Sequence, residues 1–116
     1  MSEFNSIESC LEEIENRYNN TEKVRRKLAN YEDPVQITFL DTNRSVMLLV
    51  NKDQGIKVKD NTSDENAPVK IEFLSEKIML ELFNKELGAV KAYSAGKIKV
   101  IEGQIRNLMK LRSLMF

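Results

Sequence analysis

The sequence predicts an α+β domain, and the evidence is the order of its apolar periodicities. Helical spacing fills the first part of the 116-residue chain, alternation with a period of two fills the middle, and helical spacing returns near the end. The first four strand-like segments are joined by short polar stretches, which favours antiparallel pairing. Helices grouped before and after a run of strands are typical of the α+β class. At this length we expect one domain over residues 1–116.

Two helices are predicted before the first strand. From Phe4 to Tyr18 the apolar residues recur at steps of three and four, which places them on one helix face. Asn19 and Asn20 interrupt this pattern, because asparagine side chains compete for the helix backbone. Thr21 begins a second, shorter helix that ends before the next proline.

Four strands are predicted in the middle of the chain. Residues 35–39, 56–58 and 69–73 alternate apolar and polar side chains, as strands with one wet face do. Residues 46–50 are apolar throughout, so this strand needs cover on both sides and is expected near the centre of the sheet. Its side chains divide between two layers, with Met47 and Leu49 on one side and Val46, Leu48 and Val50 on the other.

Two helices, a strand and a terminal helix are predicted after the fourth strand. Ser75 is the expected N-cap of a helix that Gly88 ends, and its apolar arc covers more than half of its circumference. A helix packed on a single sheet needs a narrower stripe, so we expect this one to contact something extra. A helical turn over 89–95, a strand over 98–100 and a helix after Gly103 complete the order.

Composition excludes several classes of function. The 18 basic residues balance the 18 acidic ones, whereas a nucleic-acid binder usually carries a basic excess. The chain has no histidine and one cysteine, and it lacks the phosphate-loop and nucleophile-elbow patterns. We therefore expect no catalysis, no metal and no cofactor. The chain shows neither a signal-peptide pattern nor an apolar run near the ~20 residues of a membrane span, so we expect a cytoplasmic protein.

Four features have two interpretations each. Cys10 lies beside the first apolar face and is either a reactive thiol or, as its position favours, a small core hydrophobe. The basic segment 23–27 is either a solvated helix face, which we favour, or a patch that meets anionic lipid headgroups. Arg112 falls inside the apolar face of the terminal helix, so it either extends past the rim or pairs with an anion of a bound ligand. The methionines of the later helices either fill the core or line an adaptable binding surface.

The last quarter of the chain carries its most specific motif. Ala-Tyr at 92–93 precedes Gly-Lys-Ile-Lys-Val at 96–100, a glycine, and Leu-Met-Lys-Leu at 108–111. This order resembles the sterol carrier protein type two family, which has an aromatic pair, a Gly-Lys-Leu-Lys-Ile-like strand, a glycine and a Met-Lys-Leu-like run. The chain departs from that pattern at Ser94, where a second aromatic residue is usual, and at Ala89, where proline is usual.

The resemblance implies an antiparallel five-stranded sheet with helices packed against it around an apolar tunnel. Members of the family bind fatty acids, acyl-CoA esters, phospholipids, isoprenoids or sterols non-covalently. We therefore expect non-catalytic intracellular binding or transfer of a lipid. The candidate ligand-binding residues are Phe39, Met47, Leu49, Phe73, Leu82, Phe83, Tyr93, Leu108, Met109, Leu111, Arg112 and Met115.

An alternative function is homodimerisation or partner interaction through the same apolar surfaces. The stripe from Phe4 to Tyr18 and the apolar end at 114–116 favour it. We accordingly expect a monomer or a homodimer with a lipid or fatty-acyl ligand and no nucleic acid. Transient contact with an anionic membrane surface is a further partner hypothesis.

Overall fold

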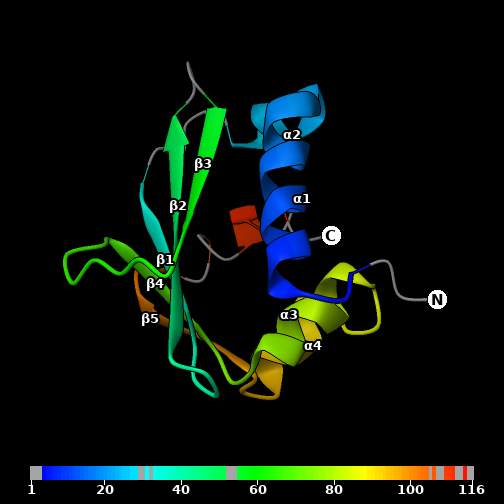
Figure 1. Cartoon of the computed structure of the whole chain (residues 1–116), viewed down its shortest axis with the longest axis vertical. Helices are drawn as coiled ribbons and strands as arrows, with labels where there is room; N and C mark the ends of the chain where they lie inside the picture. The colour runs from blue at the N-terminus through cyan, green and yellow to red at the C-terminus, as the bar shows by residue number, and fades with distance from the viewer. Residues whose placement is uncertain are drawn as a thin grey trace.

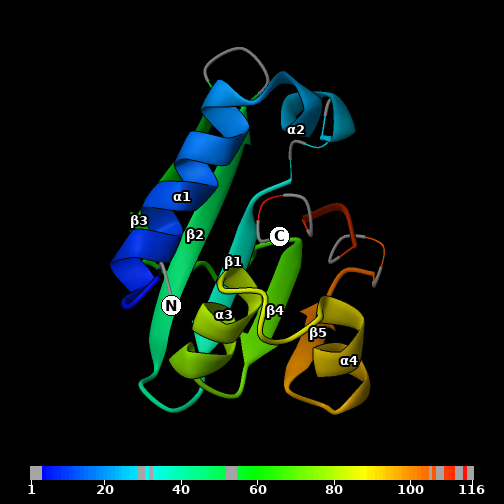
Figure 2. The same cartoon turned by 90° about the vertical axis from the view of Figure 1, so that its right-hand side faces the viewer.

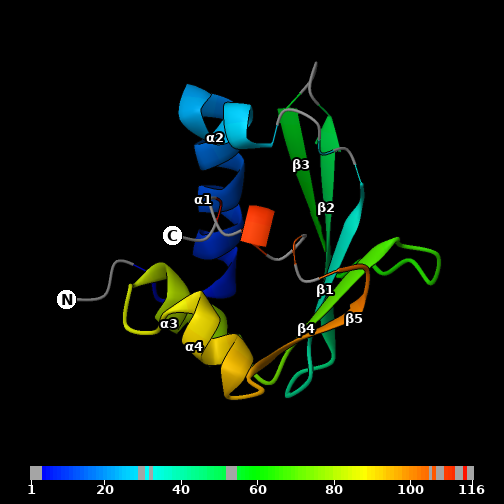
Figure 3. The same cartoon turned by 180° about the vertical axis from the view of Figure 1, so that it is seen from behind.

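The computed structural model describes residues 4–28, 31, 33–51, 55–104, 106, 109–111 and 114. A sheet forms one layer, and the helices pack against one of its faces, as Figures 1 and 3 show from opposite sides. The predicted α+β class is confirmed. In chain order the elements are α1 (Ile7–Asn20), α2 (Glu22–Lys27), β1 (Val35–Phe39), β2 (Arg44–Asn51), β3 (Gly55–Asp60), β4 (Val69–Phe73), α3 (Glu76–Phe83), α4 (Ala89–Ser94) and β5 (Ile98–Glu102).

The sheet is mixed, with the strand order β3-β2-β1-β4-β5. Strand β1 is antiparallel to β2, but it pairs in parallel with β4, so that Val35 lies opposite Val69 and Phe39 opposite Phe73. The prediction of a purely antiparallel sheet is wrong at this one pair. We expected a polar loop over 59–67 to join antiparallel neighbours. The connection, residues 61–68, instead carries the chain past β2 and β1 to the far side of β1.

This connecting stretch crosses the face of the sheet that the helices leave open (Figures 1 and 3). The amide of Thr62 donates to the carbonyl oxygen of Ser45 on β2 at 3.0 Å. The amide of Asp64 donates to the side-chain oxygen of Gln36 on β1 at 2.7 Å. These bonds attach the crossing to both strands that it passes, and they fix where β4 joins the sheet.

The register divides the strand side chains between the two faces. Ile37 lies opposite Val46 on β2 and Ile71 on β4, and all three are buried. They share one hydrophobic cluster with Ile14 of α1 and Leu82 of α3, so this is the face that the helices cover. The division of the second strand between two layers was therefore predicted correctly, with Val46, Leu48 and Val50 facing the helices.

Helix α1 begins where a serine side chain caps it. The Oγ atom of Ser6 accepts from the amide of Ser9 at 3.2 Å, satisfying one of the free donors of the first turn. The predicted apolar stripe is confirmed, because its residues are all buried. The helix continues through the two asparagines and ends at Asn20, so the break falls at Thr21, where the backbone is extended. The residues of the stripe are Phe4, Ile7, Leu11, Ile14 and Tyr18.

Helix α3 is shorter than predicted. It ends at Phe83, and Lys85 adopts a φ of +61°, a left-handed conformation that stops the helix well before Gly88. The side chain of Asn84 bonds both the amide and the carbonyl of Phe4 at 3.0 Å, so the residue after the helix holds the start of the chain. Helix α3 packs against both α1 and β4, which accounts for its broad apolar arc.

The described residues near the C-terminus also have helical backbone. Leu111 and Leu114 are buried in the main cluster, although Met109 is 40% exposed. Figure 2 shows this segment on the helix side of the sheet, between α2 and α4. The remainder of the predicted terminal helix lies outside the described residues.

Gly55 is the position in the sheet where a side chain should be least tolerated. Its φ is +92°, and an added Cβ would lie 2.2 Å from the Oδ1 atom of Asn19. That oxygen also accepts the amide of Ile56 at 3.0 Å. We expect Gly55→Ala to lower the free energy of unfolding by about 1–2 kcal/mol in urea denaturation, because it adds backbone strain and displaces this bond.

Gly88 is the matched control for that substitution. Its φ is −84°, and a Cβ there would meet nothing within 4 Å. Gly88→Ala should therefore change stability by well under about 1 kcal/mol. Equal losses in the two variants would contradict the strain at Gly55.

Candidate functional site

Five of the predicted ligand-binding residues meet beneath the helices. They belong to one buried cluster formed by the sheet, α3 and the C-terminal segment. The rings of Phe39 on β1 and Phe73 on β4 lie 5.6 Å apart at 56°, and neither side chain is exposed. The other three members are Leu82, Phe83 and Leu111.

Met47 and Leu49 lie on the opposite face of the sheet. The register places Met47 opposite Gln36 and Leu49 opposite Lys57, which both alternate away from the helices. Met47 is buried, but it is not part of the main cluster. The expectation that these two residues line one space with Phe39 is therefore corrected, because neighbouring side chains on a strand point to opposite faces.

The remaining predicted residues are exposed or cannot be placed. Tyr93 on α4 is 38% exposed, and Met109 is similarly exposed. Neither belongs to the buried cluster. Leu108, Arg112 and Met115 lie outside the described residues, so their assignment to the site stays a prediction.

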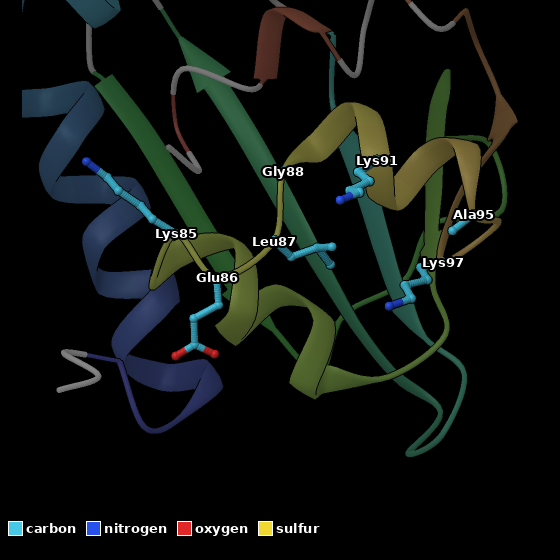
Figure 4. Close-up of a pocket in the computed structure, with 7 residues that line it drawn as sticks. All are labelled: Lys85, Glu86, Leu87, Gly88, Lys91, Ala95 and Lys97. Atoms are coloured by element: carbon cyan, nitrogen blue, oxygen red, sulfur yellow. The ribbon is translucent and has the colours of Figure 1, made fainter.

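A pocket of about 470 Å³ is lined by the loop that connects α3 to α4, by α4 and its C-terminal end, and by the turn before β5. Three lysines and one glutamate contribute to its lining, which gives it a local excess of positive charge. In Figure 4 the side chains of Lys91 on α4 and Lys97, just before β5, extend toward a shared space. Those of Lys85 and Glu86 point away from it.

The rest of this lining is small or apolar. Leu87 is partly buried and packs against the main hydrophobic cluster, so the pocket adjoins the core at this side chain. Gly88 and Ala95 occupy little volume, and the space around Gly88 is open. Sequence reasoning missed this pocket because its lysines come from separate elements. The sequence signal for an open space here is the pair of small residues, Gly88 and Ala95, that lie near these lysines in the chain.

A cluster of charges joins four elements, β2, β3, α1 and α3. The guanidinium of Arg44, at the start of β2, pairs with Asp60 at the end of β3. It also pairs with Glu8 in the first turn of α1 at 2.9 Å and with Glu76 in the first turn of α3 at 3.4 Å. Side-chain hydrogen bonding to Arg44 lowers the pKa of Asp60. The pKa of Glu8 is also lowered, first by a backbone hydrogen bond and then by Arg44.

Neither this cluster nor any other group of His, Cys, Asp and Glu in the described part of the chain has an arrangement that could hold a metal ion. Within the same residues, no helix is long and apolar enough to cross a membrane. In the basic segment 23–27, Arg26 pairs with Glu22 at 2.9 Å, and both side chains are exposed. Such a pair is typical of a solvated helix face.

Cys10 is fully buried among core residues, and burial raises the pKa of its thiol to about 12. Since the thiolate is the reactive form, we expect no reaction with a thiol reagent at pH 8 while the domain is folded. Ellman's reagent should label Cys10 completely in 6 M guanidinium and only at the rate of unfolding in buffer. Rapid labelling of the folded protein would contradict this expectation.

The comparisons with known proteins agree with this fold. The model of the SCP-2 sterol transfer family matches residues 11–116. A solution structure of palmitated SCP2L2 from Aedes aegypti has a TM-score of 0.71 at 20% identity, and the match covers 96% of this chain and 95% of that one. A crystal structure of sterol carrier protein 2 has a TM-score of 0.67 at 16% identity, and the match covers 91% of this chain and 87% of that one.

An inverting sec-alkylsulfatase, Pisa1 from Pseudomonas sp., has a TM-score of 0.64 at 14% identity. The match covers 78% of this chain but only 14% of the sulfatase. At such identities the likeness to solved structures shows the fold alone. No curated protein matches the chain.

Proposed function

Because the chain belongs to the SCP-2 sterol transfer family, we propose that it binds or transfers a lipid without catalysing a reaction on it. The family match, which covers residues 11–116, is the observation that carries this proposal. The ligand classes to test are fatty acids, acyl-CoA esters, phospholipids, isoprenoids and sterol-like molecules. The palmitated relative makes a fatty acid the first choice.

The driving force would be burial of the apolar part of the ligand. Each methylene removed from water contributes roughly 0.8 kcal/mol. The candidate surface is the helix-facing side of the sheet around Phe39 and Phe73, together with Leu82 of α3. Because these side chains are already buried, a lipid chain enters only if a covering segment moves.

The C-terminal segment is the covering piece that we propose moves. Leu111 and Leu114 bury their side chains in the core. The guanidinium of Arg17 on α1 donates to the carbonyl oxygen of Leu114 at 3.0 Å. The ammonium of Lys110 lies 6.0 Å from the centre of the Tyr31 ring. Such polar contacts contribute on the order of 1 kcal/mol each, and opening must also expose the two buried leucines.

Native mass spectrometry of the purified protein, before and after organic extraction, tests the proposal. We expect a bound lipid mass before extraction, or saturable uptake of a fluorescent fatty acid afterwards. A protein that shows neither would overturn the proposed function.

A partner-interaction role has no comparable support. The α1 stripe that favoured it is buried within the chain itself, and Leu114 is buried as well. The α1 stripe and Leu114, which we expected a second chain to cover, are therefore covered within the protein itself. Residues 115 and 116 lie outside the described residues.

A further inference from the structure

We propose that the pocket lined by the α3–α4 loop, α4 and the turn before β5 binds the anionic headgroup, a carboxylate or a phosphate, of the lipid. This inference rests on the proposed function, and it specifies that the bound lipid carries an anionic headgroup. The headgroup would lie between Lys91 and Lys97, with the apolar chain of the lipid leading away past Leu87.

The charges of the pocket lining carry the first step of the argument. Lys91 lies on α4 and Lys97 in the turn just before β5, yet their side chains extend toward the same space (Figure 4). Neither forms a salt bridge with any residue that the structure describes. The one acidic residue of the lining, Glu86, points away. Two ammonium groups facing one space repel each other, and an anion between them removes that repulsion.

This local charge is not a general property of the chain. The whole protein has equal numbers of basic and acidic residues. A lining with three lysines and one glutamate is therefore a departure from the average surface. Lysine binds phosphate and carboxylate as a compact charge with three donors, which suits a headgroup approached from two sides.

The shape of the pocket carries the second step. Its volume of about 470 Å³ lies in the range of small-molecule sites, roughly 300–1,000 Å³. Gly88 and Ala95 add little volume to the lining, and the space around Gly88 is open. Leu87 lies in the lining and packs against the hydrophobic cluster. A ligand in this pocket therefore meets cations at one side and apolar surface at the other, as an anionic amphiphile requires.

The test compares palmitate with hexadecanol, which have the same chain length but differ in headgroup charge. Dissociation constants come from displacement of a fluorescent fatty acid, or from isothermal titration calorimetry where displacement is incomplete. The wild-type protein should bind palmitate more tightly. In the Lys91→Gln/Lys97→Gln double variant, the palmitate affinity should fall by about 10-fold or more, as expected for lost charge-assisted hydrogen bonds. Hexadecanol affinity should stay within about 2-fold.

Two further variants distinguish binding in this pocket from a general effect of removing positive charge. Lys99→Gln removes the same charge two residues further along the chain, on β5 and outside the pocket lining, so the preference for palmitate should persist. Gly88→Leu leaves both lysines in place but fills the pocket, and it should weaken palmitate binding without unfolding the domain, because the backbone there suits any residue. An unchanged palmitate-to-hexadecanol ratio in the double variant would overturn the inference.

Inorganic phosphate distinguishes a lipid headgroup from a free anion. We expect 10 mM phosphate to compete weakly with palmitate and only in proteins that retain both lysines. Tight binding of phosphate alone, with no effect on palmitate affinity, would assign the pocket to a soluble anion and overturn the headgroup assignment. If neither lipid binds the wild-type protein, the proposed function fails and the headgroup assignment fails with it. If both bind with equal affinity to wild type and double variant, only the headgroup assignment fails.

Discussion

Replacing Phe73 with alanine should lower the free energy of unfolding by about 3–5 kcal/mol. The side chain is fully buried, and it packs against Phe39 across the parallel pair of strands at the middle of the sheet. The substitution removes a large apolar group from a site enclosed by the sheet and α3, so a cavity remains. Domains of this size are stable by about 5–15 kcal/mol, which makes this loss a large share of the total. Urea denaturation followed by circular dichroism measures it.

Leu74 is the matched control, since it follows Phe73 in the chain and is 45% exposed. Leu74→Ala should cost less than about 1 kcal/mol, because its side chain gives up little buried surface. Similar losses in both variants would show that strand propensity, rather than burial, governs this part of β4.

Replacing Arg44 with methionine should cost about 2–4 kcal/mol at pH 7. The arginine side chain is only 16% exposed, and it bonds carboxylates from α1, β3 and α3. Methionine keeps much of the apolar stem but leaves Asp60, Glu8 and Glu76 close together without their shared cation. The loss combines the broken hydrogen bonds with the repulsion of the remaining charges.

The pH dependence of stability identifies the origin of this loss. Arg44 lowers the pKa of Asp60 in the folded protein, so the ionised carboxylate stabilises the fold. That contribution is present above the ordinary aspartate pKa, about 3.9, and is lost as the pH falls through the lowered value. The wild-type protein should therefore lose more stability between pH 5 and pH 2.5 than Arg44→Met does.

Arg26 provides the control for both measurements. It pairs with Glu22 on the same helix, and the two side chains are 77% and 71% exposed. Arg26→Met should change stability by less than about 0.5 kcal/mol and leave the acid dependence unaltered. If Arg44→Met behaves in the same way, the charge cluster does not hold the elements together.

Local signals in the sequence predicted most elements of this fold. The spacing from Phe4 to Tyr18 located the buried face of α1, because the period of the apolar residues shows which side faces the core. Alternation located the other strands in the same way, and β2 was located by its continuous apolar run. The parallel pairing of β1 with β4 left no such trace. The connection at 61–68 is mostly polar, and a polar sequence suits a turn as well as a crossing. The crossing is seen only in the structure, where the amides of Thr62 and Asp64 donate to residues of β2 and β1.

The candidate site was less accessible to sequence reasoning than the fold. Phe39, Phe73 and Leu82 were predicted together because buried faces of neighbouring elements converge on one core. Met47 was misassigned because a strand covered on both sides offers no signal for which face meets the helices. The pocket with Lys91 and Lys97 depends on where α3 ends, and that end is set by the left-handed backbone at Lys85 rather than by Gly88.

The crossing between β3 and β4 has a consequence for the speed of folding. Strands β1, β2 and β3 pair with their neighbours in the chain and can form early as a meander. The pairing of Val35 with Val69 must wait until the whole intervening segment has been brought round. Closing the loop between β1 and β4 costs conformational entropy before the contacts of this strand pair form. Pairing between strands far apart in the chain therefore slows folding. Docking of β4 against β1 is therefore the expected rate-limiting step, and the Phe39–Phe73 contact would form with it.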